Sequence, residues 1–106
     1  MNIGAVEQHV LMAIMAQHPS AYGVSIQDHI LRRTGHEYSI GSIYAALGRL
    51  EDKGFLESRQ GQTTPQRGGR AKLYFTITAP GEATLKESLR ATRLLGRGLR
   101  WERRLA

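Results

Sequence analysis

Residues 39–54 read SIGSIYAALGRLEDKG, and this stretch decides the fold. Ser39 is suited to cap a helix, because its side-chain oxygen can accept a hydrogen bond from a backbone N–H of the first turn. Ile43, Leu47 and Leu50 recur at four- and three-residue steps, the spacing of one buried helix face. The glycine that closes the stretch is a typical helix end. We therefore predict an amphipathic helix from Ser39 to about Lys53.

Two further helices are predicted upstream of this stretch. Residues 3–16 carry apolar side chains at three- and four-residue steps, and a nearby proline prevents that helix from continuing. The next helix is predicted over residues 22–34, with Ile26, Ile30 and Leu31 facing inward. The connections between the three helices are short.

A β-hairpin and a last helix are predicted downstream. Residues 55–59 and 72–77 are rich in strand-forming side chains, and a polar, glycine-rich loop separates them. Thr78 can cap a helix that begins at Ala79. The order helix, helix, helix, hairpin, helix is typical of a winged helix-turn-helix. We expect a mainly α fold with a small β-hairpin wing, followed by a C-terminal dimerisation helix.

The last helix carries one basic stripe between two apolar flanks. The stripe consists of Lys86, Arg90, Arg93, Arg97, Arg100 and Arg104. One flank consists of Leu85, Leu89 and Leu99, and the other of Leu94, Trp101 and Leu105. A single small domain leaves too little surface to cover both flanks, so we expect the second one to pack on another copy of the chain. One wide apolar face buried within a single chain is the alternative.

These patterns divide the chain into two parts. We expect a winged helix-turn-helix DNA-binding domain over residues 1–78 and a dimerisation helix over residues 79–106. Basic charge is concentrated in the second half: residues 1–57 carry four basic and six acidic side chains, and residues 58–106 carry eleven basic and three acidic ones. Localised positive charge is typical of proteins that bind nucleic acid, although a solvated basic surface has the same composition.

Composition argues against catalysis and metal binding. The chain has no cysteine, and its four histidines are not spaced as helical metal-ligand pairs. No nucleophile and base stand in a convincing arrangement. No stretch approaches eighteen apolar residues, and no secretion signal is evident. We expect no enzyme activity, no catalytic residue, no metal, no cofactor and no membrane association, and a cytoplasmic location.

Several motifs resemble the PadR family of bacterial transcriptional regulators. They are YGVSI at 22–26, RTG at 33–35, the stretch 39–54, GGRAKLYF at 68–75 and TAPG at 78–81. The resemblance covers roughly residues 5–90 in the same order and spacing. It implies a homodimeric, usually repressing regulator whose C-terminal helix forms much of the dimer interface. It also implies a response to small aromatic or drug-like compounds.

The helix that begins after Ser39 is the predicted recognition helix. Its first turn offers unpaired N–H groups and small side chains to a phosphate or a base edge. The predicted DNA contacts on this helix are Ser39, Ile40, Gly41, Ser42, Tyr44 and Arg49. Ser39 can instead be only a cap, and Tyr44 only a half-buried aromatic.

Further DNA contacts are predicted outside the recognition helix. Arg67, Arg70 and Lys72 are expected to reach the flanking backbone or the minor groove from the wing, unless that loop is merely solvated. Tyr22 and Ser25 are expected to touch the backbone across the groove.

The partner predictions follow from these residues. We expect double-stranded DNA and a second copy of the chain as partners, with Leu94, Trp101 and Leu105 in the dimer interface. Trp101 is also the candidate to stack on a planar aromatic effector, although packing alone explains an interfacial tryptophan. The predicted function is a sequence-specific transcriptional regulator that acts as a repressor and is released by a small aromatic or drug-like effector. A winged-helix protein-interaction module and a non-specific nucleic-acid-binding protein are the alternatives.

Overall fold

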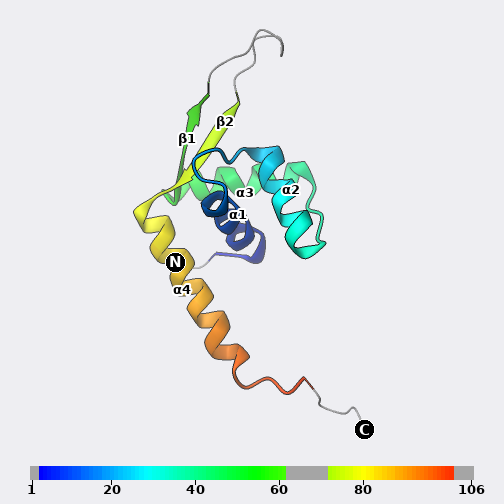
Figure 1. Ribbon diagram of the computed structural model, residues 1–106. Coiled ribbons are helices and arrows are strands. Elements are labelled where there is room, and N and C mark those ends of the chain that lie inside the picture. The colour runs from blue at the N-terminus through cyan, green and yellow to red at the C-terminus, as the bar shows by residue number, and fades with distance from the viewer. Residues whose placement is uncertain (1–2, 62–71, 102–106) are drawn as a thin grey trace.

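The computed structural model describes residues 3–61 and 72–101 (Figure 1). Within them, the predicted order of helix, helix, helix, hairpin and helix is confirmed, and so is the mainly α fold class. The elements are α1 (Ala5–Ala16), α2 (Gly23–Thr34), α3 (Ile40–Asp52), β1 (Leu56–Gln60), β2 (Leu73–Ile77) and α4 (Ala79–Gly96).

Local capping chemistry sets the ends of the helices. Ser39 Oγ accepts a hydrogen bond from the N–H of Ser42 at 3.0 Å and so begins α3. Thr78 Oγ1 accepts one from the N–H of Gly81 at 3.1 Å and begins α4. Gly35 ends α2 with a φ of 78°, a left-handed conformation that favours glycine. Both predicted N-caps are therefore confirmed.

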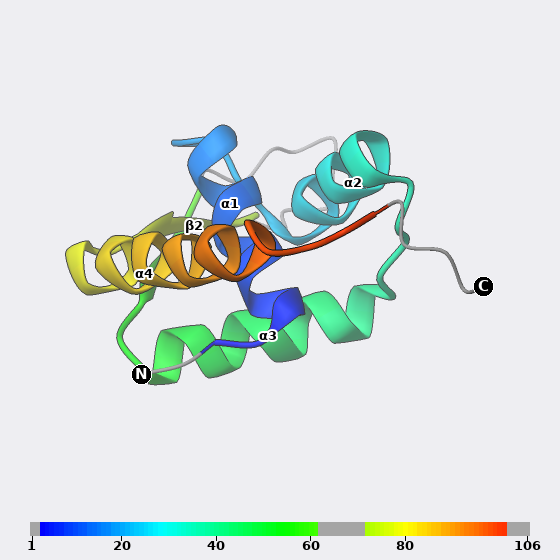
Figure 2. The same ribbon diagram turned by 90° about the horizontal axis from the view of Figure 1, so that it is seen from below.

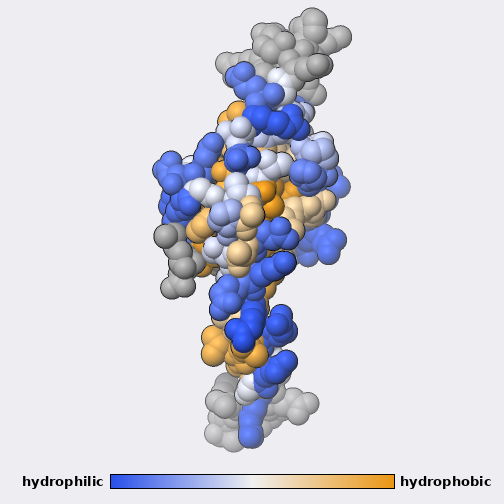
Figure 3. Space-filling view, turned by 90° about the vertical axis from the view of Figure 1, so that its left-hand side faces the viewer, coloured by the Kyte–Doolittle hydropathy of each residue, from blue (hydrophilic) through white to orange (hydrophobic). Residues whose placement is uncertain are grey.

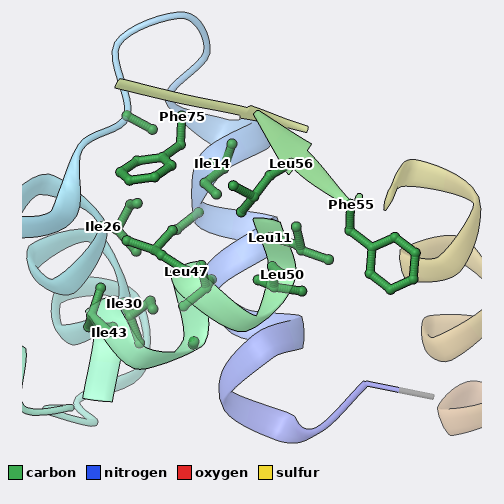
Figure 4. Packing of buried hydrophobic residues seen from close by; sticks show 14 of the residues in the cluster. Leu11, Ile14, Ile26, Ile30, Ile43, Leu47, Leu50, Phe55, Leu56 and Phe75 are labelled. Atoms are coloured by element: carbon green, nitrogen blue, oxygen red, sulfur yellow. The ribbon is translucent and has the colours of Figure 1, made fainter. Parts of the chain in front are cut away.

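Helix α1 lies at the centre of the core and packs against α2, α3, α4 and β2 (Figures 2 and 4). Val10, Leu11 and Ile14 of this helix are fully buried. The stripe predicted on α3 faces them and is also buried; it consists of Ile43, Leu47 and Leu50. Burial of these side chains is the main source of the stability of the fold.

One predicted core residue of α2 lies outside the core. Ile26 and Ile30 are buried as predicted, but Leu31 is 36% exposed. The two isoleucines are four residues apart and share one line along the helix. Leu31 is displaced by about 100° around the helix axis from Ile30, which places it on the solvent side.

The hairpin is antiparallel and pairs Leu56 with Ile77 through to Gln60 with Leu73. Both strands begin one residue later than predicted. For β1 the reason is that the N–H of Phe55 still bonds to the carbonyl of Leu50 at the end of α3. Strand β2 also bridges the segment between α1 and α2. The N–H of Phe75 donates to the carbonyl of Ala21 at 2.9 Å, which attaches the hairpin to the helices.

Helix α4 packs on the body at its start and then extends beyond it (Figure 1). Leu85 is buried, and Leu89 is partly buried against the core, as predicted for the inner flank. Leu99, assigned to the same flank, is 54% exposed and lies beyond the end of the helix. Only the first part of this flank therefore packs on the domain.

The last helix is shorter than predicted: α4 ends at Gly96, and residues 97–101 are not helical. Arg104 lies outside the described residues. Gly96 and Gly98 each weaken a helix by roughly 1 kcal/mol relative to alanine. Leu95 is 79% exposed, so packing against the described residues does little to offset that cost at this end of α4. Of the basic stripe, the helix itself contains Lys86, Arg90 and Arg93.

Candidate nucleic-acid interface

The first turn of α3 is exposed to solvent and rich in hydrogen-bonding groups. Ser39 Oγ caps the helix and donates to Ser42 Oγ at 2.9 Å. Gly41 and Ser42 are exposed, and Ile40 is 39% exposed. The N–H groups of Ile40 and Gly41 belong to the turn whose donors have no acceptor within a helix. This turn can therefore receive a phosphate or a base edge.

Tyr44 connects α3 to the start of α2. Its side chain is 49% exposed, and its ring lies against the backbone of Gly23. A Cβ atom at Gly23 would overlap that ring, so this position of Tyr44 requires glycine at the first residue of α2. The exposed part of α3 and the start of α2 therefore form one continuous surface.

Ser25 has an internal role at the start of α2. Its Oγ accepts a hydrogen bond from the N–H of Tyr22 at 2.9 Å, which caps the helix. The same hydroxyl lies 2.8 Å from Gln17 Oε1, to which it donates. Ser25 is thus already bonded within the domain, whereas the ring of Tyr22 faces the hairpin.

Lys72 lies at the base of the wing, next to the start of α2. Its Nζ is 4.1 Å from the centroid of the Tyr22 ring, within the range of a cation–π contact. The structure thus brings together Tyr22, Lys72 and, through Gly23, Tyr44. The other two predicted wing cations, Arg67 and Arg70, lie outside the described residues.

Arg49 lies on the opposite side of α3 from Tyr44, about 140° away around the helix axis. Its Nε donates to Glu7 Oε2 at 3.0 Å, and Lys53 Nζ lies 3.4 Å from the same oxygen. The Arg49 side chain remains 51% exposed. It is therefore both an internal ion-pair partner and accessible to a phosphate.

Glu7 is a buried carboxylate that sequence reasoning missed. Burial raises the pKa of the Glu7 carboxyl, but the N–H of Gly4 and the cations of Arg49 and Lys53 lower it by more. The net result is a pKa below the ordinary value of 4.5. The only sign of this ion pair in the sequence was an acidic residue within a mostly apolar helix. Its partner Arg49 on α3 is 42 residues away in the sequence.

Arg59 is a second residue that the predictions did not assign. It lies on β1, and its guanidinium carbon is 5.1 Å from the centroid of the Tyr74 ring. Its Nη2 donates to the carbonyl of Pro19 at 3.0 Å. The available signal was its position in residues 58–81, which carry four basic side chains and no acidic one.

Residues 3–61 and 72–101 also bear on metal binding and on membrane insertion. No group of three histidine, aspartate or glutamate side chains there could hold a metal ion. No helix in those residues combines the length and the apolar character needed to cross a membrane.

Residues 10–87 match the family model described as the transcriptional regulator PadR-like family. The chain belongs to this family. The PadR-like chain is thus a DNA-binding transcriptional regulator. No curated protein sequence matches it.

Solved structures share the fold of this PadR-like regulator. A transcriptional regulator from Clostridium thermocellum has a TM-score of 0.75 at 22% identity, over 90% of this chain and 92% of its own. A PadR-like transcriptional regulator from Bacillus cereus has a TM-score of 0.73 at 22% identity, over 89% of this chain and 86% of its own. A PadR family transcription regulator from Clostridium difficile has a TM-score of 0.68 at 22% identity, over 89% of this chain and 93% of its own.

The residues predicted for a dimer interface of this PadR-like regulator lie at the far end of the chain. Leu94 is on α4 and 42% exposed, and Leu95, which the predictions did not assign, is 79% exposed. Figure 3 shows an apolar patch on this part of α4 among hydrophilic side chains. Trp101 lies beyond the helix and is 85% exposed, so its predicted place on a helix flank is wrong. Leu105 lies outside the described residues.

Proposed function

We propose that this PadR-like regulator binds a specific duplex operator as a homodimer and represses transcription from it. One observation carries the proposal: the exposed first turn of α3, the start of α2 and the base of the hairpin form one surface. Tyr44 lies on Gly23, and Lys72 lies over the adjacent Tyr22. A helix that enters the major groove beside a cationic wing needs this continuity.

Different parts of the surface have different tasks in this proposal. Ser42 and Tyr44 read base edges in the major groove, where side-chain hydrogen bonds distinguish the base pairs. Ser39 and the N–H groups of Ile40 and Gly41 bond to phosphate and set the depth of the helix in the groove. These contacts determine both the register and the sequence preference.

The remaining predicted contacts supply affinity. Tyr22, Ser25 and Arg49 lie on the flanks of the recognition surface, and the wing contributes Lys72, Arg67 and Arg70. Cations that neutralise phosphates release counterions, so binding weakens steeply as salt concentration rises. These contacts position the protein without reading sequence.

A homodimer places two recognition helices on two half-sites. The exposed apolar side chains of Leu94 and Leu95 at the end of α4 support a second copy as the partner, because water leaves such side chains when two helices pack. We extend this interface to Trp101 and Leu105. A bound dimer would then repress by occupying DNA that the transcription machinery needs, in the cytoplasm.

A small aromatic or drug-like effector completes the proposal. Trp101 is the only tryptophan of the chain, and in a cavity of the dimer interface its ring would stack on a planar compound. Quenching of its fluorescence by aromatic compounds, together with weaker operator binding, would support release by an effector. Binding of such compounds without quenching would direct attention to the groove of about 520 Å³ beside Met12, Ile30 and Leu89.

The decisive experiment titrates duplexes from the gene's own upstream region against a scrambled duplex at two salt concentrations. We expect the upstream duplex to bind about a thousandfold more tightly. Equal affinities would indicate a non-specific nucleic-acid-binding protein. Absence of binding, or no effect of alanine at Arg67, Arg70 and Lys72, would indicate a protein-interaction module. Light scattering at micromolar concentration tests the dimer, and a monomeric mass would contradict it.

A further inference from the structure

The base of the wing carries two neighbouring aromatic rings with a cation at each end, here called the wing-base ladder: Lys72, Tyr22, Tyr74 and Arg59. Lys72 Nζ lies 4.1 Å from the Tyr22 centroid. The Tyr22 and Tyr74 rings meet edge to face, with centroids 6.0 Å apart and planes at 90°. The guanidinium carbon of Arg59 lies 5.1 Å from the Tyr74 centroid. Both cations of the hairpin base therefore rest on aromatic rings.

The backbone holds the ladder in place. Arg59 and Tyr74 are direct partners in the register of the hairpin, so their side chains share one face. Tyr22 and Tyr74 each adjoin one residue of the Ala21–Phe75 bridge, which keeps their rings together. Three separate segments, β1, β2 and the turn before α2, thus contribute to one arrangement.

Gly61 shows how closely the ring of Tyr74 lies on the hairpin. The N–H of Gly61 donates to the carbonyl of Lys72 at 2.7 Å, which continues the hairpin beyond the strands. A Cβ atom at Gly61 would overlap the ring of Tyr74. The ring is therefore packed on the backbone and is not free to rotate away without cost.

Arg59 retains hydrogen-bonding capacity in this position. It is exposed, and one of its N–H groups donates to the carbonyl of Pro19. A guanidinium has five N–H donors, and stacking on a ring leaves its edge accessible. The ladder adjoins the recognition surface, because Tyr22 precedes Gly23, on which Tyr44 lies. A duplex that contacts α3 and the wing would therefore reach Arg59.

We propose that Arg59 is a further phosphate-binding residue, and that Tyr74 and Tyr22 are positioning residues that hold Arg59 and Lys72 toward the duplex. The inference rests on the proposed function. An arginine that is already ordered on a ring loses less side-chain entropy when it binds phosphate than a freely moving one. The cation–π contact also leaves the positive charge of Arg59 intact, so the side chain still attracts the phosphate backbone of the DNA.

The first test removes the charge of Arg59 and measures the salt dependence of binding to the upstream duplex. The slope of log K against log salt is negative, and we expect Arg59→Gln to make it less steep by about 0.9 per chain. Arg90→Gln is the matched control, because that arginine is also exposed but lies on α4, away from the wing. The control should leave the slope unchanged. An unchanged slope for Arg59→Gln would overturn the assignment of Arg59.

The second test asks whether Tyr74 acts through Arg59. Tyr74→Phe keeps the ring and should bind as the wild type does, whereas Tyr74→Leu should bind about fivefold more weakly. In the Arg59→Gln background, Tyr74→Leu should reduce the affinity for the duplex little further, because the cation that the ring holds is already absent. Equal losses in both backgrounds would show a merely structural role for Tyr74 and overturn its positioning role.

The two proposals fail differently. Wild-type protein that does not prefer the upstream duplex contradicts the proposed function before any variant is compared. If the wild type binds this duplex specifically and Arg59→Gln binds it with the same affinity and salt dependence, only the proposal for the wing-base ladder is contradicted. Thermal unfolding of each variant should stay close to that of the wild type, so that a change in affinity is not a change in the folded fraction.

Discussion

Glu7 of α1 accepts a hydrogen bond from Arg49 Nε of α3 at 3.0 Å, with its carboxylate almost fully buried. The same carboxylate accepts from the N–H of Gly4 at 2.8 Å and lies 3.4 Å from Lys53 Nζ. One acid thus holds the first turn of α1 and the C-terminal end of α3 together. This contact orients α3 on the body of the domain.

We predict that Glu7→Gln lowers the free energy of unfolding by about 2 kcal/mol, because charged hydrogen bonds in a buried place are lost. Urea unfolding measures the change. Glu87→Gln is the control, because Glu87 is 73% exposed and its nearest arginine atom is 3.8 Å away. The control should stay within about 0.5 kcal/mol of the wild type. Equal losses for both variants would contradict the role of Glu7.

The lowered pKa of Glu7 makes this contribution dependent on pH. A carboxyl whose pKa is lower in the folded than in the unfolded state stabilises the fold above its unfolded value, near 4.5. The contribution decreases as the pH falls through the folded pKa. Urea unfolding at a series of pH values should therefore show wild type and Glu7→Gln converging in acid. A constant difference down to pH 3 would contradict the prediction.

Gly23→Ala is predicted to weaken DNA binding through Tyr44. The added Cβ would overlap the Tyr44 ring, which must then leave its place on α2. Because the ring is half exposed, it can swing outward, and we expect a change in unfolding free energy of less than about 1 kcal/mol. Fluorescence anisotropy with the upstream duplex should show a several-fold loss of affinity.

Tyr44→Ala provides the test of that route. In a Tyr44→Ala background, Gly23→Ala should cause no further loss of affinity, because the displaced ring is already gone. Additive losses would mean that the new methyl group obstructs the DNA directly.

Leu94→Glu combined with Leu95→Glu is predicted to weaken self-association at least tenfold, because two charges would enter the proposed apolar contact. Sedimentation velocity over a concentration series measures the shift toward monomer. Lys86→Glu is the comparison, because it also adds negative charge to α4 at a side chain that is 76% exposed. Unchanged association of the double variant would place the dimer contact elsewhere.

Local signals predicted the helix caps and most of the buried helix faces correctly. Ser39 and Thr78 are caps because their hydroxyls bond to N–H groups three residues later, an interaction that needs no distant partner. The buried faces of the helices follow from side-chain spacing in the same way. Leu31 was misplaced because it borders such a face, where spacing alone does not determine exposure.

The end of α4 shows the limit of periodicity. A regular basic stripe continues past Gly96, but periodic charge does not supply the burial that holds a helix together. Because Leu95 and Leu99 have little contact within the chain, the cost of two glycines decides where the helix ends.

The sequence by itself determined the order of the helices and strands, their caps and the buried stripe of α3, because each depends on residues within a few positions of one another. The tertiary structure alone decided that Glu7 meets Arg49, that Phe75 bridges Ala21 and that Arg59 rests on Tyr74. These partners come from different elements. Whether their side chains meet depends on how the elements pack, a property of the whole core.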